Sequence, residues 1–142
     1  MKISILLPYK ENFSPNYSGA VSLFVNDITK ISKYKKNICV YGSTNFNKKF
    51  QVKYHNLDLQ NNFTKSQSKS YIDEFVKQEK IKNSNLIEIH NRPTYLSYLI
   101  KQKISSKFIL YFHNDPLTMR GSKTQKERIF LIKNCSKIIF NS

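Results

Sequence analysis

The feature that most constrains the fold of this chain is an alternation of short apolar runs with stretches of helical period. The apolar runs are rich in Ile, Val, Phe and Tyr, and they occupy residues 2–7, 37–41, 51–55, 86–89, 107–112 and 137–140. The third run, residues 51–55, is the weakest candidate for a strand. Several runs are apolar at nearly every position, which is typical of parallel strands covered on both faces. The pattern predicts one Rossmann-like, three-layer α/β domain whose parallel sheet has about six strands in the order 3-2-1-4-5-6.

Four helices are predicted between these runs. The first begins near Gly19, and one stripe of it carries Val21, Phe24, Val25, Ile28 and Ile31. The second spans about residues 68–82. The third begins at Pro93, because proline is favoured in the first helical turn, where its missing N–H would be unpaired anyway. The fourth opens with Thr124-Gln125-Lys126-Glu127, which has the spacing of a capping box.

The net charge of the chain is strongly positive. It amounts to +15 over 142 residues, and a surplus of that size attracts anionic partners. Solvated surface lysine is one explanation, and docking to an anionic membrane is a second. Nucleic acid is not expected as a partner, because the sequence has no zinc-finger spacing, no RNP-like motif and no basic heptad helix. The lysines considered for membrane docking are Lys33, Lys35, Lys36, Lys48 and Lys49.

The sequence contains no membrane span, no signal peptide and no cysteine motif. No apolar run approaches the roughly 20 residues of a membrane span, and the apolar start is too short for a signal peptide. Cys39 and Cys135 lie far apart and outside any metal-binding or redox spacing, so they are expected to be inert thiols. The sequence predicts a cytoplasmic protein that is peripheral to the inner face of the membrane.

Two of the predicted strands end in the same way. Residues 86–89 run into His90-Asn91-Arg92-Pro93, and residues 107–112 run into His113-Asn114-Asp115-Pro116. The carboxyl ends of parallel strands meet at one edge of the sheet, where ligands bind. Both His-Asn pairs are therefore expected to line one cleft. The structural alternative for all four side chains is a set of hydrogen bonds that cap loops.

Two further features belong to this edge in the predicted fold. The helix that starts after Gly19 offers unpaired N–H groups to a phosphate, and Arg120 offers a guanidinium in a later loop. The alternative for Arg120 is a solvated side chain. The glycine patterns of dinucleotide-binding and P-loop proteins are absent, and so are hydrolase and metal-ligand motifs. Neither a metal nor a cofactor is expected.

These segments together resemble a known family. The opening strand with its glycine turn, then LIEIHNRP, FILYFHNDP and MRG, and a last strand ending in FNS, resemble the N-terminal half of family-4-type retaining glycosyltransferases. The likeness is to members that assemble lipopolysaccharide and cell-surface polysaccharide. It covers nearly the whole chain and is strongest over residues 86–142. The paired HNRP and HNDP segments are its specific part, whereas the glycine turn is generic.

The resemblance implies a GT-B enzyme, in which two Rossmann-like domains face each other across a cleft. Residues 1–142 would form the acceptor-side domain. The E-x7-E element and the nucleotide-sugar pocket of the family belong to a second domain. We therefore expect this domain to be incomplete at its C-terminus and inactive alone. The last run, at residues 137–140, reads as a buried strand after which a covering helix would normally follow.

The same resemblance implies roles for individual residues. The reaction would be retaining transfer of a hexose from a nucleotide sugar, acting as co-substrate, to a glycan or lipid-linked acceptor. His113 matches the histidine that reaches the transferred sugar, and Gly19 matches the glycine near the phosphates. Many members have two glycines where this chain has Ser18-Gly19. The remaining expected ligand contacts are His90, Asn91, Arg92, Asn114 and Arg120.

Two other functions stay open on the sequence. The same half-fold serves sugar-nucleotide epimerases, which also place two Rossmann-like domains face to face. A non-catalytic basic module for nucleic acid or another anionic polymer is the second, although the lysines are dispersed and the strand ends are polar.

Overall fold

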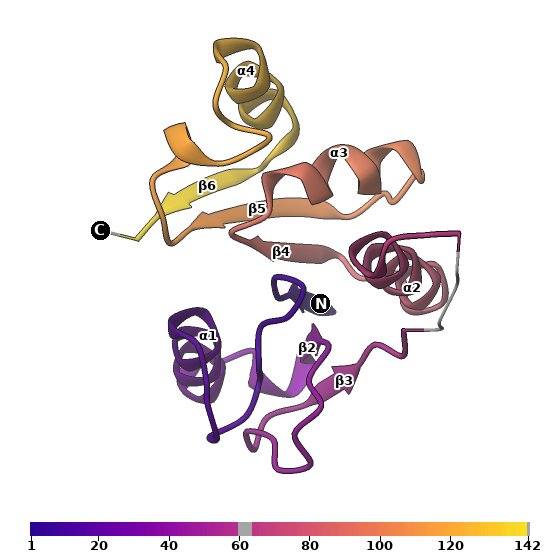
Figure 1. Ribbon diagram of the computed structural model, residues 1–142, viewed down its shortest axis with the longest axis vertical. Coiled ribbons are helices and arrows are strands. Elements are labelled where there is room, and N and C mark those ends of the chain that lie inside the picture. The colour runs from indigo at the N-terminus through magenta and orange to yellow at the C-terminus, as the bar shows by residue number, and fades with distance from the viewer. Residues whose placement is uncertain (60–63, 142) are drawn as a thin grey trace.

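The computed structural model describes residues 1–59 and 64–141, and within them it shows a parallel sheet flanked by helices (Figure 1). The strands follow the order β3-β2-β1-β4-β5-β6, so the predicted topology is confirmed. All five pairings between neighbouring strands are parallel. The strands are β1 (Ile3–Leu6), β2 (Ile38–Gly42), β3 (Tyr54–Asn56), β4 (Leu86–His90), β5 (Lys107–Phe112) and β6 (Lys137–Phe140).

The helices begin where the sequence predicts. Gly19 is the N-cap of the first helix, and Pro93 is the first residue of the third. The capping box of the fourth is formed: the Thr124 hydroxyl accepts from the Glu127 N–H at 3.2 Å, and the Glu127 carboxylate accepts from the Thr124 N–H at 2.9 Å. The helices are α1 (Ala20–Ile31), α2 (Gln67–Lys82), α3 (Pro93–Lys101) and α4 (Gln125–Asn134), with short 3-10 turns at Lys35–Asn37 and Pro116–Thr118.

The helices cover the two faces of the sheet unequally. Helix α1 lies on one face, where Val21 and Val25 join a core cluster with Ile5 of β1. Helices α2, α3 and α4 lie on the other face and contribute to the second core cluster (Figure 1). In the part of the chain that the structure describes, α1 is the one helix whose buried residues belong to the first cluster.

This asymmetry corrects the expectation that the strands are covered on both faces. In β1 and β2 every position is buried, as expected. In β5 burial alternates: Leu110 is fully buried, whereas Ile109 and Tyr111 are half-buried. The reason is that α1 packs over the half of the sheet formed by β1 and β2. The first face of β4 and β5 is left partly open beside it.

Three local predictions are also wrong. The third strand is Tyr54–Asn56, not 51–55, because the backbone bends at residues 51 and 52 and reaches the ladder with β2 only at Tyr54. Ile31 is 85% exposed, since it is the last residue of α1 and lies beyond the apolar stripe. The last strand is an edge strand with one described neighbour, β5, and its Phe140 is 63% exposed.

A buried tyrosine fastens α2 to the end of β1. The Tyr71 ring is fully buried, and its hydroxyl donates a hydrogen bond to the Leu7 carbonyl at 2.7 Å. Burial raises the pKa of this hydroxyl well above its ordinary value. Leu7 is the residue directly after β1, so this hydrogen bond fixes the backbone where the chain leaves the sheet.

We predict that Tyr71→Phe lowers the free energy of unfolding by about 1–3 kcal/mol, because the Leu7 carbonyl loses a donor in a dry environment. Urea unfolding followed by circular dichroism measures the change. The control is Tyr17→Phe, because the Tyr17 ring is 84% exposed, and it should change stability by less than about 0.5 kcal/mol. Equal effects of the two changes would show that the buried hydroxyl bond contributes nothing.

Candidate functional site

The candidate site is built by the pairing of β4 with β5. Their parallel register sets His90 opposite Tyr111, so the two strands end side by side. His113 follows β5 by one residue, and its side chain meets that of His90. The Nδ1 atom of His90 and the Nε2 atom of His113 are 2.9 Å apart, which is hydrogen-bond distance. The two histidines that the sequence singled out are thus in direct contact at one sheet edge.

Asn91 holds the ends of the two strands together. Its backbone adopts a left-handed conformation with φ of 53°, which asparagine tolerates better than most residues. Its side-chain oxygen accepts from the His113 backbone N–H at 2.8 Å, and its own N–H donates to the Tyr111 carbonyl at 2.9 Å. The side chain is buried. Asn91 therefore has the structural role considered as its alternative, and it positions His113.

Aromatic rings fix the orientation of the two imidazoles. The His90 ring stacks on Tyr111 with a centroid distance of 4.6 Å and an interplanar angle of 4°. Phe24 of α1 meets His113 edge-on at 5.0 Å. His90 is fully buried and His113 is half-buried. One ring is thus enclosed, and the other forms the exposed end of the pair.

Both imidazoles are held in their neutral form. Burial lowers the pKa of His113 to about 4, and the neighbouring His90 adds to the shift. Burial also lowers the pKa of His90, against an opposing effect of Glu88. A shared hydrogen bond between two rings needs one donor and one acceptor, which two neutral imidazoles supply. Near neutral pH the pair carries no charge.

Glu88 lies behind His90 on the same strand. Its Oε2 atom is 3.8 Å from the Nε2 atom of His90. Both atoms are buried, and neither has a hydrogen-bond partner among residues 1–59 and 64–141. The sequence pattern does not single out Glu88, because one acidic residue inside an apolar run forms no motif. Its position two residues before His90, and so on the same face of the strand, was the available signal.

Gly19 caps α1 as predicted, but its neighbour there is a carboxylate of the chain. Glu11 accepts a hydrogen bond from the Ser22 N–H at 3.0 Å, in the first turn of the helix. A Cβ atom added to Gly19 would collide with the Glu11 side chain. The absence of a side chain at Gly19 thus allows Glu11 to reach the helix terminus. Phosphate binding at this point stays a prediction, and it would require Glu11 to move away.

The other expected contacts are exposed side chains. Arg92 donates to the Asn91 carbonyl at 2.8 Å. Asn114 directly follows His113, and Arg120 lies in the loop before α4. Arg120 lines a hollow of about 320 Å³ between the start of α3 and α4, whose lining contains neither histidine. Asn114 thus adjoins His113 in the chain, whereas the Arg92 guanidinium is held by the Asn91 carbonyl and Arg120 lines a separate hollow. Contact of these three side chains with a ligand stays a prediction.

A polar hollow at the ends of the other three strands was missed. It has a volume of about 500 Å³. Its lining follows β1, β2 and β3 in sequence, so it opens at the same carboxyl edge as the histidines. Ligands bind at the carboxyl ends of parallel strands, and the same reasoning predicts this hollow once the third strand is placed at Tyr54–Asn56. The hydroxyl, amide and ammonium groups in its lining belong to Tyr9, Lys10, Asn12, Ser43, Asn45, Asn56 and Gln67.

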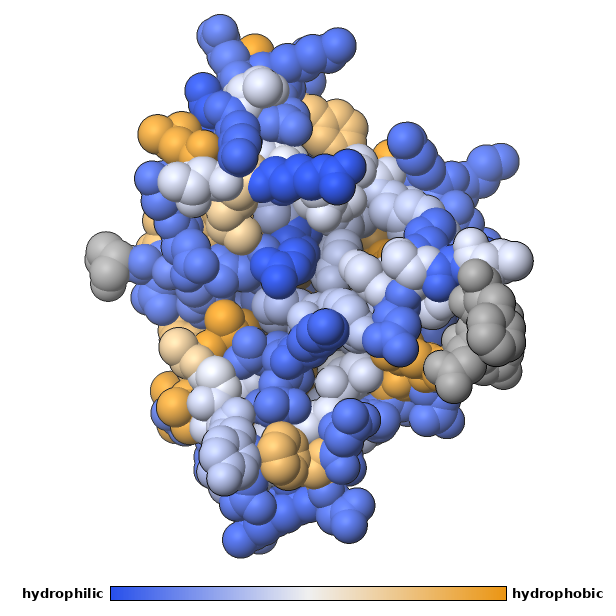
Figure 2. Space-filling model, viewed as in Figure 1, coloured by the Kyte–Doolittle hydropathy of each residue, from blue (hydrophilic) through white to orange (hydrophobic). Residues whose placement is uncertain are grey.

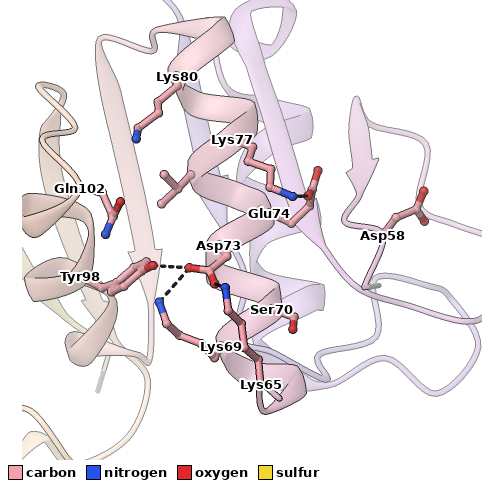
Figure 3. Close-up of a pocket in the computed structure, with 11 residues that line it drawn as sticks. Asp58, Lys65, Lys69, Ser70, Asp73, Glu74, Lys77, Lys80, Tyr98 and Gln102 are labelled. Atoms are coloured by element: carbon pink, nitrogen blue, oxygen red, sulfur yellow. Dashed lines mark hydrogen bonds and ion pairs between the residues drawn. The ribbon is translucent and has the colours of Figure 1, made fainter. Parts of the chain in front are cut away.

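Another hollow, of about 310 Å³, lies between α2 and α3, and Asp58 lines both it and the polar hollow (Figure 3). At its centre Asp73 accepts from Lys65 at 3.1 Å and from Lys69 at 2.8 Å, and also from the Tyr98 hydroxyl. Burial raises the pKa of Asp73, but the hydrogen bonds from Lys69, Tyr98 and Lys65 outweigh it and lower the value to about 2. The hydrogen bond from Tyr98 of α3 to Asp73 of α2 ties the two helices together.

Among residues 1–59 and 64–141, no three His, Cys, Asp or Glu side chains come together in a way that could hold a metal. No helix in that part is long and apolar enough to cross a membrane. Burial raises the pKa of both Cys39 and Cys135, so both are protonated thiols near neutral pH.

Exposed lysines occur at several places along the described chain, and hydrophilic side chains are spread over the face shown in Figure 2. Lys35 and Lys36 are exposed in the turn before β2, at the amino edge of the sheet, which is opposite the histidines. With Lys30 and Lys53 they line a hollow of about 350 Å³. Docking to an anionic membrane stays a prediction from the sequence, and these side chains would present the amino edge to it.

We predict that His113 stays neutral until the pH falls to about 4. An imidazole in the unfolded chain takes up its proton near pH 6.5. The unfolded state therefore binds more protons between about pH 6.5 and 4, and the protein should lose stability as the pH falls through that window. The measurement is an NMR titration of the His113 ring, with the urea-unfolded chain as reference. A midpoint at or above that of the unfolded chain would contradict the enclosed, neutral pair.

Comparison with models of known protein families and with curated proteins gave no match for this chain. The fold is shown directly: an α/β domain with a parallel sheet of six strands in Rossmann-like order.

Proposed function

We propose that this domain is the acceptor-side wall of a retaining glycosyltransferase that moves a sugar from a nucleotide donor to a glycan or lipid-linked acceptor. The single observation that carries the proposal is the convergence at one sheet edge of the His90–His113 pair and the polar hollow at the ends of β1, β2 and β3. The resemblance of the HNRP and HNDP segments to cell-surface glycosyltransferases supports the same function.

The lining of the hollow suits a polyhydroxylated ligand. A sugar hydroxyl both donates and accepts hydrogen bonds, and amide and hydroxyl side chains do the same. Asn12, Asn45, Asn56 and Gln67 supply four amides, and Ser43 and Tyr9 supply hydroxyls. A ligand site needs such a set of convergent polar groups to fix the orientation of its ligand. In this proposal the acceptor glycan occupies the hollow and extends toward the histidines.

His113 would act as a hydrogen-bonding group at the transferred sugar. With a pKa of about 4 its ring is neutral at physiological pH and is a weak base. A general base works best when its pKa is near the operating pH. His113 is therefore proposed to orient a sugar hydroxyl and to stabilise developing charge, and not to take up a proton. Asn114 directly follows His113, Arg92 follows the end of β4 by two residues, and both exposed side chains would contact the ligand in this proposal.

One domain supplies only part of such an active site. Electrostatic catalysis needs preorganised groups around the reacting atoms in a water-excluded site. The His113 edge is open, since His113 is half-buried and the first face of β4 and β5 is partly uncovered. We propose that a second Rossmann-like domain provides the opposite wall and the donor pocket. Gly19 would face the donor phosphates only after Glu11 withdraws from the helix terminus.

We predict that the 142-residue chain binds oligosaccharides weakly, with Kd on the order of 1 mM, and shows no turnover with nucleotide sugars. NMR titration of the labelled protein with soluble glycans should shift the resonances of the hollow and of His113. Asn45→Ala should weaken binding by about 2- to 10-fold, the net worth of one hydrogen bond.

The matched control is Asn47→Ala, because Asn47 is exposed two residues away and does not line the hollow. It should leave binding unchanged. Turnover or tight donor binding by this chain alone would contradict the one-wall account. Glycans that shift no resonance of the hollow would contradict the assignment of the acceptor site.

A further inference from the structure

We infer that Glu88 and His90 are positioning residues that fix the tautomer of His113, so that the Nδ1 atom of His113 is a bare acceptor for a hydroxyl or N–H group of the ligand. For the ligand this inference rests on the proposed function, and it names the chemical groups by which the ligand would bind His113. The tautomers themselves follow from the contacts within the protein.

The first step is the contact between Glu88 and His90. The Glu88 Oε2 atom and the His90 Nε2 atom are 3.8 Å apart, buried, and without another partner among the described residues. An N–H directed at a carboxylate is attracted, whereas a ring lone pair in that place is repelled. Leaving either buried group unpaired is costly. The carboxylate therefore favours the proton on Nε2 of His90.

The second step is that the tautomer of His90 determines the tautomer of His113. With its proton on Nε2, a neutral His90 has a lone pair on Nδ1. That atom is 2.9 Å from the Nε2 atom of His113, and the contact needs a donor. His113 must therefore carry its own proton on Nε2. The stacking of His90 on Tyr111 at 4.6 Å holds the plane of the first ring, and the contacts of its two nitrogens with Glu88 and His113 define which edge faces which partner.

The third step concerns the remaining nitrogen of His113. Its Nδ1 atom has no proton in this tautomer, so it can only accept. Its neighbour is the side-chain amide nitrogen of Asn141 at 3.4 Å, and an amide N–H is a donor, as the assignment requires. The Asn141 backbone N–H donates to the Phe112 carbonyl at 2.8 Å, which holds Asn141 beside the site.

The bare Nδ1 atom of His113 determines which ligand groups can bind there. Asn141 is exposed, so a ligand O–H or N–H can replace its amide at the Nδ1 atom of His113. A carbonyl or phosphate oxygen offers a lone pair and would be repelled there. The opposite tautomer would select those acceptor groups instead. The Glu88 carboxylate, whose Oε2 atom is buried two residues before His90, thus sets which class of group is accepted at the sheet edge.

The test is the ring nitrogen spectrum of the 15N-histidine-labelled protein at pH 7. Protonated and bare ring nitrogens differ in 15N shift and in their couplings to the ring carbon-bound protons. We expect the Nδ1 resonance of His113, and that of His90, at the position of a bare nitrogen. In Glu88→Gln the amide can face the ring with either its oxygen or its NH₂, so both rings should shift toward a mixture of tautomers.

Glu88→Asp keeps the carboxylate and should restore the single tautomer, at least in part, which a loss of packing alone would not do. Glu74→Gln is the control, because Glu74 pairs with Lys77 and Gln78 on α2 and should leave both rings unchanged. A proton on Nδ1 of His113 in the native protein, or an unchanged spectrum in Glu88→Gln, would overturn the inference. No ligand is needed, so failure of glycan binding would contradict the proposed function and leave this result standing.

Discussion

The hydrogen bond between His90 and His113 is the interaction on which the candidate site depends, and the parallel pairing of β4 with β5 makes it possible. Register places the two strand ends side by side. Asn91 then adds a side-chain bond to the His113 backbone, which removes freedom from the loop that carries the second ring. Preorganisation of this kind is what a site needs if its groups are to act without rearranging.

The unequal covering of the sheet explains why this site is both rigid and accessible. Helix α1 covers β1 and β2, and its Phe24 reaches the edge of His113. Beyond Phe24 the first face of β4 and β5 is half-buried, so burial is complete at His90 and partial at His113. The buried His90 is therefore held by the core, whereas the half-buried His113 is accessible to a ligand.

Much of the fold and half of the site could be predicted from the sequence. Strand order and helix starts follow from apolar periodicity and from capping residues such as Pro93 and Thr124, which are local signals. The bounds of the third strand and the burial of Ile31 were predicted wrongly, because packing against neighbours, and not local pattern, sets where a strand or a buried stripe ends. The partners of His90 and Gly19, namely Glu88 and Glu11, could not be predicted, since side-chain contacts depend on the three-dimensional arrangement.

The central claim is that the two strand-end histidines form one hydrogen-bonded unit. Nitrogen–nitrogen scalar coupling in the 15N-labelled protein tests it most directly, because such coupling passes through an N–H···N hydrogen bond. The account predicts a resolved coupling between the Nε2 atom of His113 and the Nδ1 atom of His90, lost in His90→Phe. Two rings that show no coupling and titrate independently near pH 6.5 would contradict it.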